Sequence, residues 1–239
     1  MVNRFTVGKD LDFDDRLAKY DVFGSMAHCK MLAEVGLISQ KESVHLLSVL
    51  NEILEEIQNN TFEIDPEAED IHSQIEAILI KKLGLAGKKY TLLVPETIRF
   101  FLDIKLYLLD EIRKIGGLTD QLFQLLIRLA NQHKNVLLTG YTHFQIAMPS
   151  SFGLWFGAYA QALTNDAEML LFVNIINENP LGSAAVTVLP YFNRESTTYH
   201  LNFKTLNYNS VYTQMTRGKS EKLLASSMAV LAGTLNRFS

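Results

Sequence analysis

The feature that most constrains this chain is the length of its stretches without proline or glycine. Only five prolines and thirteen glycines occur in 239 residues. Between these breakers, apolar residues recur every three or four positions, a spacing that gathers them on one face of a helix. The longest such stretch follows Pro95, and the sequence predicts a helix there that the pair Gly116–Gly117 either kinks or splits.

The same apolar spacing predicts five more helices, over 14–35, 39–60, 66–84, 147–177 and 219–238. Three of their ends carry local signals. Ser39 opens a capping box, Pro66 suits a first helical turn, and Gly84 suits a helix C-terminus. Few strand patterns occur, and a polar, turn-rich region over 179–218 is expected to be loop. The sequence therefore predicts an all-α, bundle-like fold.

The helices divide at the proline before the longest one. We expect an N-terminal helical domain over 1–95 and part of a central helical bundle over 96–239. Apolar residues cover more than one stripe of the stretches 100–130 and 147–177. Helices that are apolar on several sides are buried on several sides, so the sequence predicts association with further subunits.

Charge and cysteine content exclude several classes of protein. The formal net charge is −4, from 22 basic and 26 acidic residues, and no basic cluster occurs, so nucleic-acid binding is not expected. The single cysteine, Cys29, allows no disulfide within the chain and suggests a reducing compartment. The polar N-terminus lacks a secretory core, and no apolar run is long enough to cross a membrane. A cytoplasmic protein is the simplest expectation.

One segment, "GYTHFQIAMPSS", combines residues that a simple turn does not need. Gly140 permits a tight turn from which Thr142 and His143 would project. The helix expected from near Ala147 would offer free backbone N–H groups. A hydroxyl, an imidazole and a helix N-terminus can together bind a carboxylate and move a proton. The alternative is a capped loop, for which Thr142 or Ser150 would be enough.

Two other segments carry polar residues within helical patterns. In "DVFGSMAH", Gly24 and Ser25 are best explained by the close approach of another helix, and His28 by a satisfied polar contact. In "EDIHSQIE", His72 lies in a first helical turn, where an imidazole can meet a ligand and the helix N-terminus favours an anion. Glu76 could fix its tautomer. A surface pair of His72 and Glu76 is an equal alternative.

These segments resemble those of argininosuccinate lyase, in the fumarase/aspartase superfamily. The likeness covers essentially the whole chain in family order, through "FTVGKD", "DVFGSMAH", "EDIHSQIE", "LGLAGKK", "GYTHFQIAMP", "NPLGSAA" and "NYNSVYTQMTRGKSEK". The resemblance implies a homotetramer in which long central helices form one bundle and active sites draw on several subunits. It also implies a cofactor-free β-elimination that converts argininosuccinate to arginine and fumarate.

The resemblance further implies roles for residues of this chain, with no metal or other cofactor. The catalytic candidates are His143 and Thr142. The residues expected to bind argininosuccinate, or a related small anion, are His72, Ser25, Asp14, Gln145 and Arg217. A β-elimination needs a base for the carbon-bound proton, an acid for the leaving nitrogen, and donors for the charge that develops on the neighbouring carboxylate.

The chain departs from the family pattern in three places. Where the family has a segment like HTGRSRNDQ, this chain has apolar residues, at Leu92, Leu93, Val94 and Pro95. Each charge-assisted hydrogen bond lost there would cost about 1.5–3 kcal/mol. A Gly-Ser-rich turn is replaced by "VTVLPYFNR". The sequence given stops before the family's GSSxMPxKxNP loop, which carries the catalytic serine.

Two hypotheses follow from these departures. The chain is an argininosuccinate lyase whose activity is impaired as it stands. Alternatively, it is a catalytically inactive homologue that serves as a structural, oligomerising helical subunit. An unrelated helical binding module would require the ordered set of motifs to be a coincidence.

Overall fold

A computed structural model describes most of the chain, namely residues 10–65, 68, 70–90, 96–171, 176–184, 187–188 and 190–239. The chain forms two compact units. Unit 1 contains the residues up to Leu108 together with Asn177–Arg217, and unit 2 contains Leu109–Ile176 together with Gly218–Ser239. The helix α6 (Glu96–Gln132) runs through the division. The expected domain boundary at residue 95 stays a prediction.

Unit 1 is built around its N-terminal helices, α2 (Asp10–Glu34), α3 (Gln40–Gln58), α4 (Ile71–Leu83) and α5 (Leu85–Tyr90). The helix α2 packs against α3, α4 and α8. The predicted capping box is confirmed: the Ser39 side chain accepts from the backbone N–H of Glu42, whose carboxylate accepts from the backbone of Ser39. The predicted end at Gly84 is also confirmed, with a positive φ of 58° that suits glycine.

A close approach of two helices explains Gly24, as the sequence suggested. A Cβ atom at Gly24 would lie 2.7 Å from Cδ2 of Leu102 in α6. Leu102 is itself fully buried and has little room to move. Glycine at this position therefore lets the first part of α6 reach α2.

The rest of unit 1 is more structured than the loop predicted for 179–218. It contains the helices α8 (Arg194–His200) and α9 (Ser210–Met215), and the two-residue strands β3 (Glu178–Asn179), β4 (Ser183–Ala184), β5 (Thr187–Val188) and β6 (Thr205–Leu206). Arg194 holds this region together by donating to the carbonyl oxygens of Leu181 and Asn207. Side-chain to backbone contacts of this kind leave no periodic sequence signal.

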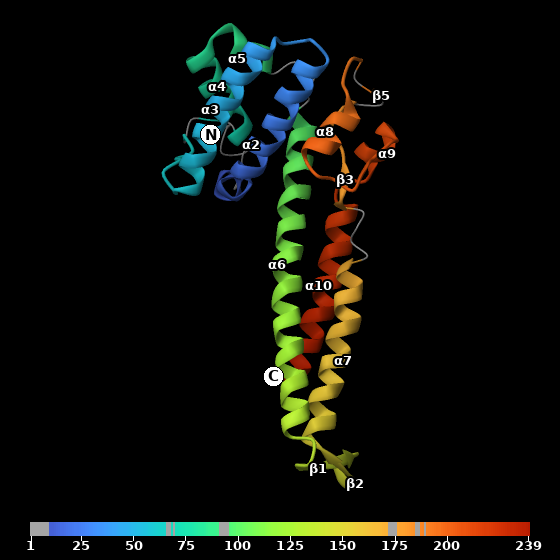
Figure 1. Cartoon of the computed structure of the whole chain (residues 1–239). Coiled ribbons are helices and arrows are strands. Elements are labelled where there is room, and N and C mark those ends of the chain that lie inside the picture. The colour runs from blue at the N-terminus through green and yellow to red at the C-terminus, as the bar shows by residue number, and fades with distance from the viewer. Residues whose placement is uncertain are drawn as a thin grey trace, which may run out of the picture. The chain divides into compact units, whose positions relative to one another are not determined.

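Unit 2 contains the second part of α6, a hairpin of β1 (Leu137–Thr142) and β2 (Gln145–Ser151), and the helices α7 (Phe152–Leu171) and α10 (Lys219–Phe238). Figure 1 shows α7 and α10 side by side, and these helices are in direct contact. Near the end of α10, the Trp155 ring stacks on Phe238 at 5.5 Å, and Tyr159 donates to the carbonyl oxygen of Arg237 at 2.8 Å. An aromatic cluster thus fixes the end of α10 on α7.

The fold is mostly helical, as predicted, but several boundaries were wrong. The helix expected over 147–177 begins only at Phe152, because residues 145–151 pair with β1 as a strand. The helix expected from Pro66 begins at Ile71, capped by Asp70. The pair Gly116–Gly117 does not interrupt α6, which continues for 37 residues. None of the helices in the described ranges is both long and apolar enough to cross a membrane.

Candidate functional site

The start of α4 places His72 deep in unit 1. Two carboxylates hold this helix N-terminus. Asp70 accepts from the backbone N–H of Ser73 at 2.8 Å, and Asp14 of α2 accepts from the backbone N–H of Ile71 at 3.2 Å. Acidic side chains stabilise a helix N-terminus, because the first N–H groups of a helix have no partner within it and the helix dipole is positive at that end. Asp14, expected to bind substrate, is thus engaged in anchoring α4.

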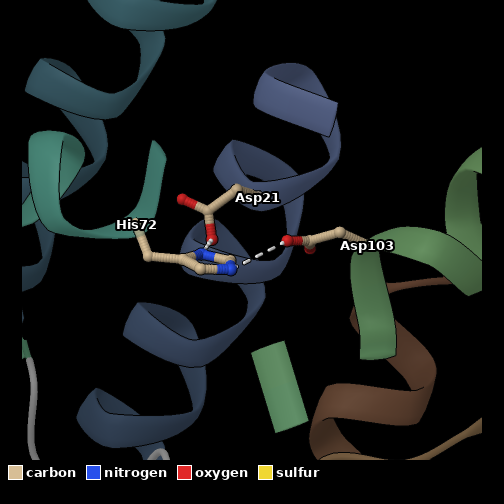
Figure 2. Close-up of side chains that lie close together, drawn as sticks. All are labelled: Asp21, His72 and Asp103. Carbon is tan, nitrogen blue, oxygen red and sulfur yellow. Dashed lines mark hydrogen bonds and ion pairs between the residues drawn. The ribbon is translucent and has the colours of Figure 1, made fainter. Parts of the chain in front are cut away.

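His72 lies between two aspartates from different helices (Figure 2). Its Nδ1 is 2.6 Å from Oδ1 of Asp21 in α2, and its Nε2 is 3.5 Å from Oδ2 of Asp103 in α6. All three residues are buried. The proposed surface pair with Glu76 is therefore wrong, and the residue that orients the imidazole is Asp21.

Opposing electrostatic effects act on this cluster. Burial lowers the pKa of His72, but the charge of Asp21, its hydrogen bond and the charge of Asp103 outweigh burial and raise that pKa to about 9. Burial, followed by repulsion from Asp21, raises the pKa of Asp103 well above its ordinary value. Buried carboxylates resist ionisation unless an opposite charge lies beside them. The cluster therefore favours a protonated imidazole between the two acids.

Ser25 lies one turn from Asp21 on α2 and faces the same interior region. Its hydroxyl is hydrogen-bonded to the hydroxyl of Tyr90, which is fully buried at the end of α5. A narrow cavity of about 10 Å³ is lined by Asp21, Ser25 and Asp103, among other residues. That volume is close to the minimum that holds one water molecule. Within unit 1, the structure thus brings Ser25 near the His72 cluster.

The second group of candidates, Thr142, His143 and Gln145, lies in unit 2 at the tip of the hairpin. All three side chains are exposed. The turn is formed by His143 and Phe144, with positive φ angles of 49° and 61°. The tight turn expected at Gly140 and the helix start expected near Ala147 were both wrong.

Gly140 instead allows the two strands of the hairpin to approach. It sits in β1 at a register shift, where a Cβ atom would lie 2.8 Å from the carbonyl oxygen of Met148. The hairpin is also rich in exposed apolar side chains, and Phe144 is 98% exposed. A tip that presents Thr142, His143 and Phe144 to solvent is suited to contact something outside its own unit.

The remaining predicted residues are placed as follows. Arg217 is exposed and follows α9, at the end of the segment that unit 1 contributes from the C-terminal half of the chain. Leu92, Leu93, Val94 and Pro95 lie outside the described residues. None of these placements tests the predicted roles, which stay predictions.

Sequence reasoning missed Asp21, Asp103 and Tyr90. Asp21 and Asp103 are separated from His72 by 51 and 31 positions, so no local spacing reveals the cluster. A weaker signal was present in "FFLDIKLYLL", where Asp103 interrupts an apolar stretch of a helix. Charged residues on an apolar helix face are rarely buried without a partner. Asp21, His72 and Asp103 are also the described residues that could hold a metal ion.

Comparisons with known proteins support the superfamily suggested by the motifs. A protein-family model described as "Lyase" matches residues 3–239. The chain is 46% identical over 241 residues to the argininosuccinate lyase of Bacteroides fragilis, covering 99% of this chain and 53% of that protein. It is 38% identical over 239 residues to that of Thermotoga neapolitana, covering 99% and 60%. The chain thus spans about half the length of its Bacteroides relative.

Solved structures agree on the fold. A crystal structure of EDDS lyase in complex with formate has a TM-score of 0.85 at 22% identity, covering 95% of this chain and 44% of that chain. A fumarate lyase from Mesorhizobium has a TM-score of 0.78 at 16% identity, covering 93% and 53%. At such identities the likeness establishes architecture alone. Because the family model spans almost every residue, the chain belongs to the lyase family, with the fumarase/aspartase fold.

Proposed function

We propose that this chain is an argininosuccinate lyase-like protein, whose family reaction is the cofactor-free β-elimination of argininosuccinate to arginine and fumarate in arginine biosynthesis. The observation that carries the proposal is the 46% identity to argininosuccinate lyases over 99% of the chain. The chain spans about half the length of those relatives. We therefore propose that the chain has impaired activity when no intact lyase is present.

The proposed chemistry assigns the hairpin tip to proton transfer. His143 takes part in moving the proton, and Thr142 hydrogen-bonds the substrate. Their exposure on a turn supports these roles, since a group that meets substrate from outside its own unit has to be accessible. Donors placed where charge develops lower the barrier most in a site that excludes water. The tip of one copy is therefore expected to complete a site on another copy.

The substrate-binding roles fall to Gln145, beside the catalytic pair, and to His72, Ser25, Asp14 and Arg217 of unit 1. The charged His72 cluster would contribute through its field and through its fixed position at the start of α4. This assignment requires several subunits, and we propose a homotetramer in the cytoplasm. No nucleic acid or membrane partner is part of the proposal.

A second candidate function is a catalytically inactive subunit that assembles with itself or with an intact lyase. Apolar residues in place of the expected polar segment at 92–95 favour this role, because they remove substrate contacts. Exposed apolar side chains on the hairpin and the long helices also favour it. Large apolar surfaces on a soluble protein mark sites of association.

The deciding experiment measures fumarate release from argininosuccinate by its ultraviolet absorbance. The purified chain is assayed alone and mixed with an intact argininosuccinate lyase. Weak turnover by the chain alone, well below that of the intact enzyme and abolished by His143→Ala, supports the first proposal. No turnover alone, with a changed rate for the intact enzyme on mixing, supports the structural subunit. No turnover and no change on mixing contradict both.

A further inference from the structure

Arg99 lies at the start of α6 and buries its guanidinium group in unit 1. The residue is 7% exposed. The centre of the guanidinium group lies 4.5 Å from the centroid of the Tyr90 ring, over the face of that ring. A guanidinium group is planar and more weakly hydrated than an ammonium group, so it stacks on aromatic rings in buried positions. The cationic end of Arg99 is therefore held in the interior by the face of Tyr90.

Acidic groups surround the guanidinium group of Arg99. Burial lowers the pKa of Arg99, but its acidic neighbours outweigh burial and raise that pKa. These neighbours are Tyr90, Asp21, Glu76 and Asp103. Asp21 and Asp103 also line, together with Arg99, the narrow cavity of about 10 Å³. The surroundings of Arg99 thus favour a positive charge at this place in unit 1.

Open hydrogen-bond acceptors supply an independent observation. Asp103 is 1% exposed, and neither of its carboxylate oxygens has a hydrogen-bond partner in the described part of the chain. The same holds for Oδ2 of Asp21. Buried carboxylates normally have a cationic or hydrogen-bonding partner. Arg99 lines the same cavity but donates to none of these oxygens, because its attachment to α6 leaves its guanidinium group on the Tyr90 ring.

We propose that the Tyr90 ring and the carboxylates of Asp21 and Asp103 form a recognition site for a guanidinium group, which Arg99 occupies within its own chain. The ring receives the flat face of the cation, and the open carboxylate oxygens accept from N–H groups at its edge. A free alkylguanidinium ion is not attached to α6, so it can contact the ring and the oxygens together. Arg99 is therefore an internal competitor of ligands that carry this group.

The chemistry of the site selects a guanidinium group over an ammonium group. An ammonium group is a compact, strongly hydrated charge, whereas a guanidinium group offers a flat face to a ring and several N–H donors at its edge. The biological meaning of the site rests on the proposed function, since argininosuccinate and arginine both carry a guanidinium group. In that reaction, Arg99 competes with the arginine part of the substrate for unit 1.

The test removes the competitor and supplies its end group as a separate molecule. Arg99→Ala deletes the atoms that make up N-ethylguanidinium, so this ion is the ligand used, with equal sodium chloride as the reference. We expect it to raise the Tm of Arg99→Ala in a saturable way, because it binds the folded chain. N-ethylurea, which has a similar shape and no charge, should have no effect. The wild-type chain should not respond to either compound, because Arg99 fills its site.

Two further variants assign the effect to this site. When Arg99→Ala is combined with Asp103→Asn, calorimetric titration should show N-ethylguanidinium binding about 10–100-fold more weakly, because a charge-assisted hydrogen bond is lost. Arg113→Ala is the matched control. It removes an exposed arginine of the same helix, which pairs with Asp110, and this variant should gain no response to N-ethylguanidinium.

The proposal is overturned if folded Arg99→Ala does not bind N-ethylguanidinium, or if N-ethylurea raises its Tm equally. If Arg99→Ala does not fold by itself, it is refolded with either compound present from the start. Recovery of the helical circular dichroism with N-ethylguanidinium alone supports the proposal, and recovery with neither or with both contradicts it. These measurements do not use turnover, so their failure leaves the proposed lyase activity standing, and an inactive chain leaves the guanidinium site standing.

Discussion

Glu42 connects the start of α3 to α5 through one carboxylate. It accepts from the backbone N–H of Ser39 at 2.8 Å and from Nζ of Lys89 at 2.7 Å. The hydrogen bond from Lys89, followed by those from Ser39, lowers the pKa of Glu42 from 4.5 to about 2. A depressed carboxyl pKa contributes stability that is fully present above the unfolded value and is lost as the pH falls toward the folded value.

This contribution predicts a specific response to acid. Between about pH 4.5 and pH 2, the wild-type chain should lose stability as Glu42 becomes protonated. The variant Glu42→Gln should start less stable at pH 7 and lose less over that range. Urea midpoints at pH 7 and pH 3 measure both effects. Glu52→Gln, which removes the exposed pair with Lys82, is the control. An unchanged acid response in Glu42→Gln would contradict the prediction.

At the scale of single residues, the sequence identified His72 but not the partners that determine its charge. The helix start that contains His72 could be read from neighbouring residues. Asp21 and Asp103 meet it only after α2, α4 and α6 have packed together. Contacts of this kind depend on tertiary structure, so even a correct list of helices does not reveal them.

Two glycines of α7 differ sharply in their surroundings, and this difference defines an experiment. A Cβ atom at Gly153 would lie 2.5 Å from Cα of Lys134 and 2.6 Å from the carbonyl oxygen of Ala130, whereas nothing lies within 4 Å of one at Gly157. Backbone atoms cannot move aside as a side-chain end can. Gly153→Ala should therefore destabilise the protein by about 1–3 kcal/mol.

The matched variant is expected to have the opposite sign. Gly157→Ala replaces a poor helix former in open space and should stabilise the protein by up to about 1 kcal/mol. Denaturant unfolding of both variants, followed by a probe in unit 2, measures the difference. Equal effects of the two substitutions would show that the close contact at the start of α7 is absent.

The hairpin turn contains backbone strain. His143 and Phe144 both adopt positive φ angles, which glycine and asparagine accept more readily than phenylalanine. Phe144→Gly should relieve this strain and stabilise the hairpin by roughly 1 kcal/mol. Phe144→Ala removes the same exposed ring without the relief and is the control. Amide exchange in β1 and β2 reports the result, and faster exchange in Phe144→Gly than in Phe144→Ala would contradict it.

At the scale of elements, the sequence predicted the helix ends that neighbouring residues determine, and it missed the hairpin, which has no usual turn sequence. The capping box at Ser39 and the glycine stop at Gly84 are local, and both were predicted. The hairpin was missed because its turn has His143 and Phe144 where two-residue turns usually have Asn-Gly. Pro149 in β2 also argued against a strand, although an edge position tolerates proline.

The residues at 92–99 can be encoded by DNA that carries the expected family segment in another reading frame. One DNA string that the genetic code allows for Leu-Leu-Val-Pro-Glu-Thr-Ile-Arg, the residues at 92–99 of this chain, is CTG-CTC-GTT-CCC-GAA-ACG-ATC-AGG. Read from its third base, the same string encodes Ala-Arg-Ser-Arg-Asn-Asp-Gln, nearly the family segment expected here. DNA that encodes Val-Thr-Val-Leu-Pro at 186–190 can likewise encode Gly-Tyr-Gly-Ser-Ser when it is read in the same shifted frame. That peptide would be the expected Gly-Ser-rich turn.

We therefore expect paired, compensating single-nucleotide shifts to flank both segments in the coding DNA. Resequencing the gene from genomic DNA and from transcript tests this expectation. Codons that cannot give the family residues in the offset frame would contradict it. A version restored to the offset frame in both segments should recover polar substrate contacts, and it would be the chain to compare in the fumarate assay.

At the scale of the whole molecule, exposed apolar surface predicts association. Large apolar side chains of unit 2 are exposed on its helices as well as on the hairpin, among them Leu118, Leu125, Leu154, Met169 and Val230. Monomeric proteins rarely expose apolar patches beyond a few hundred Å². Light scattering of the purified chain should therefore give a mass above that of one copy, or show aggregation. A stable, sharply melting monomer would contradict this prediction and the proposed tetramer.

The aromatic cluster at the end of α10 contains an intrinsic fluorescent probe. Trp155 is the only tryptophan among 239 residues, and its ring stacks on Phe238. Its emission therefore follows the local polarity where α7 meets α10, and does not sense the interior of unit 1 directly. Fluorescence and circular dichroism recorded on one sample can thus separate the melting of unit 2 from that of the chain as a whole. An association that covers this end of α10 would also shift the emission, without any added label.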